Sequence, residues 1–323
     1  MTTQIAVLDD YAGVALEIGG FNRIEGAEFS VFQDTIKDED ALVERLLPFQ
    51  VICMMRERTP FPASLLKRLP NLKLLVTTGP RNLSIDLPAA TEQGVIVSST
   101  ESRKTTTSEL SMLLLLNLSR NFVEEYRAME SGGWQQGLGR DLHGLSLGLI
   151  GLGKIGCQMA GLGRAFGMEV HAWSPNLTAE KCLDQNVEHH ESLASLMAAS
   201  DAVSIHLVLS ERSTGLVDAA ALSAMRERSI LINTSRGPIV DQSALLNSMK
   251  AGKPWKAALD VYDEEPLPAD SPLRDKILTE SGRLVLSPHL GYVTEQTWQI
   301  FYTQTVDAIL AWQKGEPLRV LNT

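Results

Sequence analysis

The chain has 323 residues, of which 44% are hydrophobic and 21% charged, a composition typical of a globular protein with about two domains. Its 39 acidic residues outnumber the 29 basic ones, and the net charge of −10 argues against binding to nucleic acid or to an anionic membrane. The longest apolar run, Leu110 to Leu118, is far shorter than the ~20 residues of a membrane span. Three scattered cysteines without metal-ligand spacing predict free thiols in a reducing, cytoplasmic compartment and no metal site.

Short apolar runs in the first hundred residues predict strands, and the amphipathic segments between them predict helices. The strands are expected at 4–8, 51–55, 72–76 and 95–97, and the helices at 38–47 and 63–69. Near-continuous apolar strands that alternate with helices form parallel sheets buried on both faces. This part of the chain therefore predicts an α/β domain.

A single long helix is predicted over 105–131, and a polar, glycine-rich connection follows it at 132–144. The second series of strands is expected at 145–150, 168–173, 202–207, 229–233, 256–260 and 283–287. Six strands separated mostly by helices predict a doubly wound sheet. Asp241 is a good N-cap for one of these helices, and a last amphipathic helix is predicted over 294–314.

The first strand of the second series is followed by a GxGxxG segment, Gly151-Leu152-Gly153-Lys154-Ile155-Gly156. Gly151 permits a tight turn, Gly153 lets a pyrophosphate approach the backbone, and Gly156 lets the helix pack closely on the strand. The N-terminus of the helix attracts the phosphates through its free N–H groups. The segment predicts binding of a dinucleotide, NAD or NADP, and a purely structural turn is the alternative.

Three further side chains, Arg236, Glu265 and His289, follow later strands, where ligands bind in an open α/β sheet. An arginine can hold a carboxylate through two hydrogen bonds, and histidine beside a carboxylate is the usual acid–base pairing. Each also has a structural interpretation, as a surface arginine, a solvated acidic loop or a histidine bonded to backbone. Together they would suffice to reduce a 2-keto acid: Arg236 binds the substrate carboxylate, His289 donates the proton, and Glu265 keeps His289 charged.

The other histidines of the second series are interpreted from their positions. His171 lies within a predicted strand and is expected to be packed, whereas His189 and His190 lie in a polar stretch and are expected to be solvated. His206 ends a strand and stays a weak candidate for the site.

The sequence resembles the D-isomer-specific 2-hydroxyacid dehydrogenase family through GLGKIG (151–156), NTSRGPIVD (233–241), ALDVYDEEP (258–266) and SPHLG (287–291). The resemblance implies an NAD(P)-dependent oxidoreductase acting on a small 2-keto or D-2-hydroxy acid, with Arg236, Glu265 and His289 as its catalytic set. It implies a Rossmann-type cofactor domain, 100–290, inserted in a flavodoxin-like substrate domain, 1–99 plus 291–323, and a homodimer. Besides the glycine-rich segment, the cofactor contacts predicted on this basis are Thr107, Ser174, Thr234, Ser235 and Asp260, the last at the nicotinamide carboxamide.

Three departures from the family pattern bear on specificity. The second cofactor strand usually ends in Asp and here ends in Ser174, which predicts only a modest preference for NAD over NADP. The turn that often reads Gly-x-Gly here reads Gly79-Pro80-Arg81, and Arg81 is either a second anion contact or a surface charge. Arg56 is expected to contact the substrate with Gly79, and Tyr292 is expected to narrow the pocket.

The alternative function is an NAD(H)-sensing, corepressor-like binding protein of the same fold. Formate-type chemistry is disfavoured, because that branch usually has Gln where this chain has Glu265. The substrate, the physiological direction and the choice between NAD and NADP stay open at this point.

Overall fold

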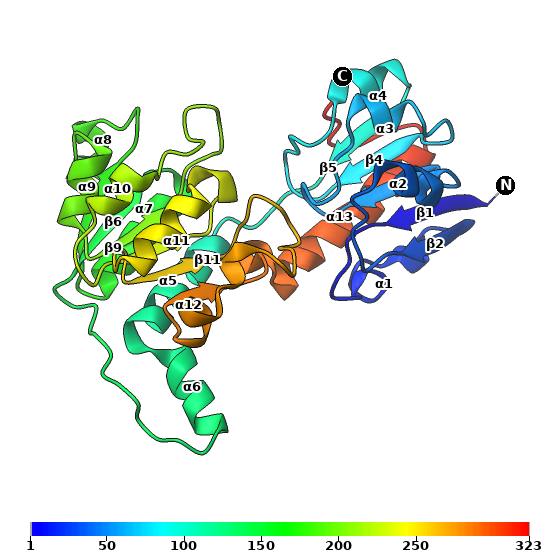
Figure 1. Ribbon diagram of the computed structural model, residues 1–323. Helices are drawn as coiled ribbons and strands as arrows, with labels where there is room; N and C mark the ends of the chain where they lie inside the picture. Colours follow the sequence, from blue (N-terminus) through cyan, green and yellow to red (C-terminus); the bar gives the residue numbers. More distant parts are fainter. Residues whose placement is uncertain (1, 323) are drawn as a thin grey trace. The chain divides into compact units, whose positions relative to one another are not determined.

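The computed structural model describes residues 2–322, which form two compact units (Figure 1). One unit runs to Arg103 and resumes at Thr294, and the other spans Lys104–Val293. These bounds lie a few residues beyond the predicted ones at 99 and 290.

The first unit is built on a parallel five-stranded sheet with strand order β2-β1-β3-β4-β5, a flavodoxin-like order. Its strands are β1 (Thr3–Val7), β2 (Ala27–Val31), β3 (Val51–Met54), β4 (Leu74–Thr77) and β5 (Ile96–Ser99). Its helices are α1 (Ala15–Ile18), α2 (Glu39–Leu46), α3 (Ala63–Leu66), α4 (Leu87–Glu92) and α13 (Glu295–Gln313). The predicted strands and helices are confirmed, whereas the half-buried edge strand β2 and the short helices α1 and α4 were not predicted.

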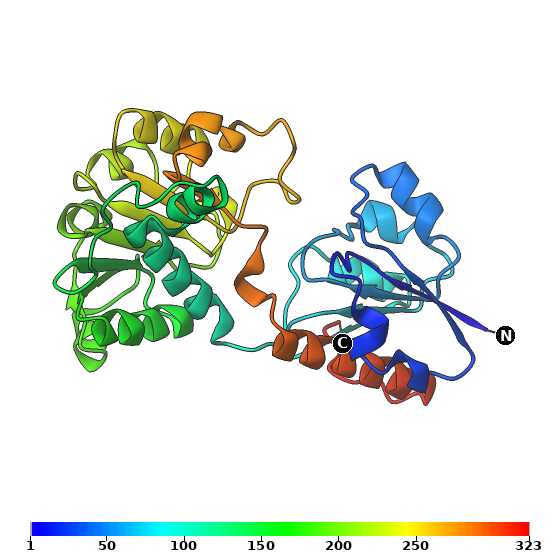
Figure 2. The same ribbon diagram turned by 90° about the horizontal axis from the view of Figure 1, so that it is seen from below.

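The C-terminal segment belongs to the first unit although it is distant in sequence. Helix α13 lies along one face of that unit's sheet (Figure 2), where the buried Tyr302 hydroxyl donates to the Asp10 carboxylate at 3.0 Å. Beyond the helix, the Arg319 guanidinium donates to the Ser99 carbonyl at 2.8 Å. These bonds tie the helix and the segment after it to residues next to β1 and in β5.

The second unit has a parallel seven-stranded sheet with order β12-β11-β10-β9-β6-β7-β8, which is doubly wound and confirms the predicted α/β class. Its strands are β6 (Ser146–Ile150), β7 (Glu169–Trp173), β8 (Glu188–His189), β9 (Ala202–Ile205), β10 (Ile230–Asn233), β11 (Lys256–Leu259) and β12 (Leu284–Leu286). Its helices are α5 (Thr106–Arg120), α6 (Phe122–Glu130), α7 (Lys154–Ala165), α8 (Ala179–Asp184), α9 (Leu193–Ala199), α10 (Ala219–Ser223), α11 (Gln242–Lys250) and α12 (Lys276–Glu280).

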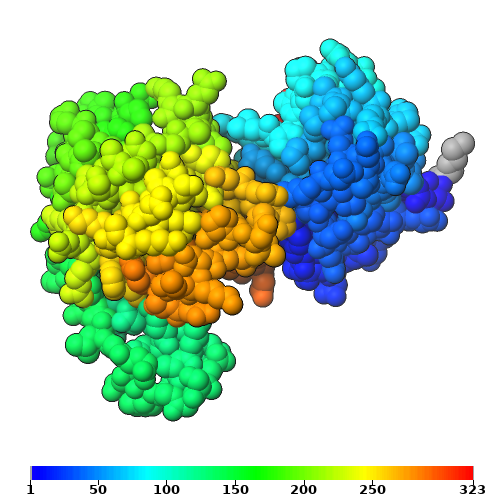
Figure 3. Space-filling model, viewed as in Figure 1, coloured from blue at the N-terminus to red at the C-terminus, as the bar shows by residue number. Residues whose placement is uncertain are grey.

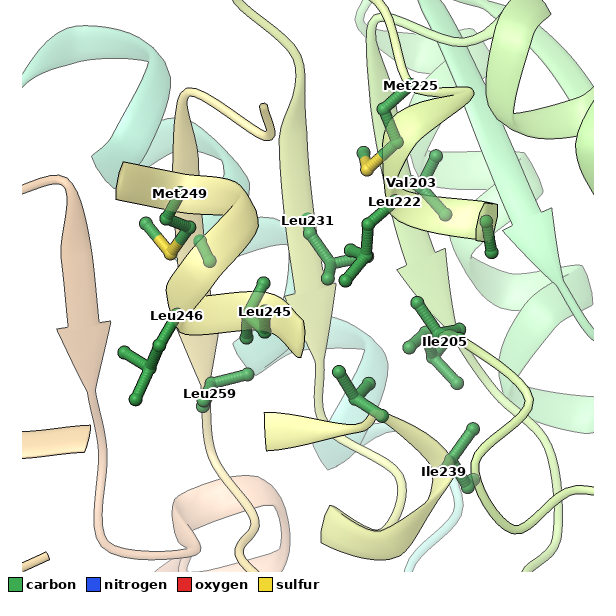
Figure 4. Close-up of a cluster of buried hydrophobic side chains, with 14 of the residues drawn as sticks. Val203, Ile205, Leu222, Met225, Leu231, Ile239, Leu245, Leu246, Met249 and Leu259 are labelled. Atoms are coloured by element: carbon green, nitrogen blue, oxygen red, sulfur yellow. The ribbon is translucent and has the colours of Figure 1, made fainter. Parts of the chain in front are cut away.

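Apolar clusters cover both faces of this sheet. On one face, Leu245 and Met249, four residues apart on α11, pack with Leu231 of β10 and Leu259 of β11 (Figure 4). The neighbouring strand residues, such as Ile232, point to the other face and its own cluster. Each fully buried leucine contributes about 1.5–3 kcal/mol through removal of apolar surface from water. The sheet is therefore a rigid support for the loops at its carboxyl edge.

The prediction of a single helix over 105–131 is wrong. Asn121 adopts a left-handed conformation with φ 56° and separates α5 from α6, while the Asn117 side chain accepts from the Val123 N–H at 3.1 Å. Asparagine enters this conformation at low cost, so the apolar pattern continues across a break in the backbone. Helix α6 buries none of its residues.

Among the helices within 2–322, none combines the length and the apolar character needed to cross a membrane. Cys53, Cys157 and Cys182 are free thiols, as predicted.

Candidate active site

The carboxyl ends of the adjacent strands β12, β11, β10, β9 and β6 lie along one edge of the second sheet, because all are parallel. His289, Glu265, Arg236, His206 and Gly151 follow these five strands in that spatial order. A cavity of about 140 Å³ lies away from this edge, beside Ser146 and Glu169 at the start of β6 and β7. The polar residues at the carboxyl edge therefore define the candidate site.

His289 and Glu265 form a close pair. The Nδ1 atom of His289 lies 2.6 Å from Oε2 of Glu265, and the two side chains are 20% and 18% exposed. The other carboxylate oxygen, Oε1, accepts from the Tyr262 N–H at 3.0 Å, which fixes the plane of the carboxylate. With Nδ1 engaged, Nε2 is the ring atom left to exchange a proton with a substrate. The Tyr292 ring meets the imidazole edge to face, with centroids 5.2 Å apart.

Asp260 anchors the loop that carries His289. Its Oδ1 accepts from the Ser287 hydroxyl at 2.6 Å and the Leu290 N–H at 2.7 Å, and its Oδ2 accepts from the Gly291 N–H at 2.9 Å. Burial raises the pKa of the Asp260 carboxyl, and these hydrogen bonds oppose that shift. Three bonds to one carboxylate hold the loop on both sides of His289, whose backbone is left-handed with φ 54°.

Thr107, predicted near the cofactor, contacts the same loop. Its hydroxyl donates to the Gly291 carbonyl at 3.0 Å, so the first turn of α5 supports the chain just after His289. One helical turn further, Ser111 shares a hydrogen bond of 2.7 Å with Thr234. Helix α5 therefore connects the loops that follow β10 and β12.

Arg236 lies in a turn braced by Asn233, which the sequence analysis did not single out. The Asn233 side chain donates to the Arg236 carbonyl at 2.9 Å and accepts from the Ser235 N–H at 3.0 Å. An asparagine side chain that bonds to the backbone two residues further on stabilises turns in this way. The segment NTSRG therefore contained a sequence signal for this turn. A methyl group on Gly237 would overlap the backbone at Tyr262, and that close approach brings the arginine turn beside the loop that carries Glu265. The Ser235 hydroxyl donates to the Leu207 carbonyl and ties the turn to the end of β9.

The glycine-rich loop fits a dinucleotide. Among residues 2–322, a methyl group on Gly153 would meet no atom within 4 Å, so the backbone borders open space, and no side chain caps the N-terminus of α7. Gly151, with φ 104°, and Gly156 leave no room for a side chain, since their added carbons would strike the His206 and Gly151 carbonyl oxygens. The two tight glycines shape the loop, and the open one leaves the phosphate space free.

His206 faces this loop across the point where the strand order reverses, between β6 and β9. Within the described residues, both of its ring nitrogens are buried and have no hydrogen-bond partner. Burial lowers the pKa of His206 to about 3, so the ring is neutral. Unpaired polar atoms of this kind are uncommon and call for a ligand or an ordered water.

The remaining predicted cofactor residues lie at the same edge. Lys154 is exposed at the first position of α7 with the half-buried Ile155 beside it. Ser174 follows β7, and its carbonyl accepts from the Leu177 N–H at 3.0 Å, which closes a turn.

The first unit brings two of its three predicted substrate residues together. The Arg56 guanidinium donates to the Thr78 carbonyl at 3.3 Å, next to Gly79, where an added methyl would overlap that guanidinium. Asn82, another residue that sequence reasoning missed, donates to the Arg56 carbonyl at 2.6 Å. Arg81 is exposed at the surface of the unit.

Comparisons with known proteins agree with this geometry. Residues 112–291 match the family model of the D-isomer specific 2-hydroxyacid dehydrogenase NAD-binding domain. The chain is 30% identical to glyoxylate reductase of Korarchaeum cryptofilum over 88% of its length and 83% of that protein. It is 29% identical to D-3-phosphoglycerate dehydrogenase of Methanocaldococcus jannaschii over 95% of its length, but it spans only 56% of that longer relative. A crystal structure of phosphoglycerate oxidoreductase from Vibrio cholerae matches 98% of this chain and 100% of its own, with 36% identity and a TM-score of 0.90.

Proposed function

Because the chain belongs to the D-isomer specific 2-hydroxyacid dehydrogenase family, we propose that it transfers a hydride between a nicotinamide cofactor and a 2-keto or D-2-hydroxy acid. The observation that carries the proposal is the 2.6 Å pair of His289 and Glu265, held beside the Arg236 turn at the carboxyl edge of an NAD-binding sheet. An acid–base group, a carboxylate anchor and a cofactor site at one edge are the parts that this reaction needs.

In this proposal Arg236 binds the substrate carboxylate through the planar fork of its guanidinium and polarises the neighbouring carbonyl. His289 gives a proton from Nε2 to the carbonyl oxygen during reduction and takes it back during oxidation. Glu265 stabilises the charged imidazole that exists before the proton leaves. When bound, the reduced nicotinamide supplies the hydride, so a 2-keto acid, a hydride and a proton give one 2-hydroxy acid.

The cofactor would lie on Gly151, Gly153 and the first turn of α7, with Thr234, Ser235 and Asp260 at its nicotinamide end. We assign a slight preference for NAD over NADP. Ser174 can hydrogen-bond the adenosine ribose but does not repel a 2′-phosphate, and 174–180 contains no Lys or Arg to attract one. Arg56 and Gly79 of the first unit stay predicted substrate contacts.

We propose that the protein is a homodimer formed through the second unit. Helix α6 and the loop after it project from the body of that unit (Figure 3), and their large apolar side chains are exposed. The exposed side chains are Phe122 (64%), Tyr126 (54%), Met129 (56%), Trp134 (70%) and Leu138 (94%). Clustered apolar exposure of this kind marks an interface, and in soluble oligomers the partner at such an interface is most often a second copy of the same chain.

The free thiols support a reducing, cytoplasmic compartment for the protein.

The test is the oxidation of NADH and of NADPH, followed with glyoxylate, hydroxypyruvate, its phosphate ester, pyruvate and a bulkier 2-keto acid. Turnover of at least one keto acid, lost in His289→Gln, is the expected result. Glu265→Gln should also lower the rate of reduction, because the carboxylate that stabilises the charged imidazole is removed. Cofactor binding without turnover of any keto acid would instead favour a binding protein of the same fold.

A further inference from the structure

A cluster of potential metal ligands lies at the β7–β8 edge of the second sheet, away from the catalytic strands. Strand β8 is parallel to β7, and Glu188 is the register partner of His171. Because side chains alternate along a strand, His190 points to the same face as Glu188, and His189 points to the other. The backbone alone therefore places His171, Glu188 and His190 together.

Two of the three pairs of ligand atoms lie at distances that a single metal ion can span. His171 Nδ1 lies 3.1 Å from His190 Nε2 and 3.3 Å from Glu188 Oε2, and all three atoms lie within 4.8 Å of one another. A tetrahedral zinc ion with bonds of about 2.0–2.1 Å holds its ligand atoms ~3.3–3.4 Å apart. Two His nitrogens and one carboxylate oxygen also form a ligand set that zinc uses in proteins.

The hydrogen bonds of Ser195 favour the tautomer of His190 that has a lone pair on Nε2. The Ser195 hydroxyl donates to the Ser192 carbonyl at 2.9 Å, so toward His190 Nδ1, 3.2 Å away, it can only accept. His190 then carries its proton on Nδ1 and turns the lone pair of Nε2 toward His171 and Glu188. A hydrogen bond that fixes the tautomer of a metal-ligating histidine in this way is a regular feature of metal sites.

We propose that His171, Glu188 and His190 bind a divalent metal ion of the zinc class, with water at the fourth position. The His171 side chain is 8% exposed and forms the floor of the site, whereas Glu188 is 68% exposed and leaves a path for the ion. The ion would bridge β7 to β8, a strand of two residues, and so reinforce the edge of the sheet next to Ser174. The prediction of no metal site considered spacing along the chain, whereas these ligands come from β7, from β8 and from the residue that follows β8.

The test uses full-length protein stripped with a chelator and titrated calorimetrically with Zn²⁺ alone. One Zn²⁺ per chain is expected. Glu188→Gln and His190→Gln should each weaken binding at least about tenfold, since even the outer partners of metal ligands contribute about 10–100-fold. His189→Gln is the matched control, because the same change is made one residue away on the opposite face of β8, and it should bind Zn²⁺ like the parent.

Thermal unfolding supplies a second readout that does not depend on activity. Zn²⁺ should raise the midpoint of the parent and of His189→Gln but not that of His190→Gln. Absence of Zn²⁺ binding in the parent would overturn the proposal. So would binding that survives both Glu188→Gln and His190→Gln, and loss of binding in His289→Gln instead would locate the ion at the His289–Glu265 pair.

Discussion

Replacement of Gly153 by alanine separates the binding role of the glycine-rich loop from its structural role. The added methyl meets no atom of the described part of the chain within 4 Å, and φ at this position is −83°, which any residue adopts. The free energy of unfolding should therefore change by less than about 1 kcal/mol. The same methyl would occupy space that we assign to the pyrophosphate.

The expected loss in cofactor affinity follows from the hydrogen bonds that the methyl would prevent. A hydrogen bond from a backbone N–H to a charged phosphate is worth about 1.5–3 kcal/mol, so losing one weakens binding roughly 10- to 150-fold. Titration of NADH by its fluorescence measures this loss, and thermal unfolding checks that the fold is intact. NADH binding within about twofold of the parent would refute the assigned position of the phosphates.

Gly156→Ala is the structural counterpart. Its methyl would overlap the Gly151 carbonyl oxygen and come within 3.1 Å of the carbonyl carbon, and neither backbone atom can rotate away. Helix α7 must then move off β6, at a cost of roughly 1–3 kcal/mol or more. We expect a lower unfolding midpoint even without cofactor. Unchanged stability would mean that the helix packs less closely than the structure shows.

Three further substitutions test the catalytic loops and the acid stability of the fold. Arg236→Lys should lower kcat/KM by a factor of about 30 or more, roughly 2 kcal/mol, because lysine lacks the planar fork, and activity within threefold of the parent would contradict the role. Asp260→Asn turns an amide donor toward an N–H of the 287–291 loop. We therefore expect kcat, measured by steady-state kinetics, to fall, and the free energy of unfolding, measured by urea denaturation, to decrease by about 1–3 kcal/mol. Full activity would show that the loop needs no anchor. Burial alone would raise the pKa of Asp201, but hydrogen bonds from Ser146 and the charges of Arg226 and Arg140 outweigh it and hold the pKa below its usual value. The Asp201 carboxylate therefore stabilises the fold above about pH 4 and loses that effect as pH falls through the lowered pKa. The urea midpoints of the parent and of Asp201→Asn should therefore converge in acid. A difference between the two midpoints that stays constant with pH would show that ionisation of Asp201 does not affect stability.

The sequence predicted those parts of the fold that depend on local pattern. The buried strands of both sheets, the helix that Asp241 caps and the C-terminal helix all carry a continuous apolar run or a helical period. Strand β8 was not predicted, because a two-residue edge strand has no hydrophobic period to detect. The break at Asn121 was not predicted for the opposite reason, since the apolar pattern runs through it unchanged.

The residues that position the site could not be identified from the sequence, because their hydrogen-bond partners are distant in sequence. The sequence predicts Asp260 as a cofactor contact, which stays a prediction, but does not reveal that both of its oxygens accept from the loop about thirty residues later. His189 and His190 were expected to be solvated, but they are half-buried and hydrogen-bonded, and the partner of His190 lies on the neighbouring strand. Sequence spacing locates the candidate site residues at strand ends, and only strand order and register show which residues hold them in place.

The bonds around His289 explain why the proposed acid–base group keeps its geometry. A histidine at φ 54° is held in a region that L-residues enter at a cost, so its surroundings must determine its conformation. Glu265 fixes the ring, Asp260 fixes the backbone on both sides, and Thr107 holds the Gly291 carbonyl. All three supports belong to the second unit, so the orientation of the imidazole is set by the same rigid sheet that carries the glycine-rich loop. A proton donor oriented in this way needs no rearrangement of its own loop before a proton moves, which is what electrostatic preorganisation requires.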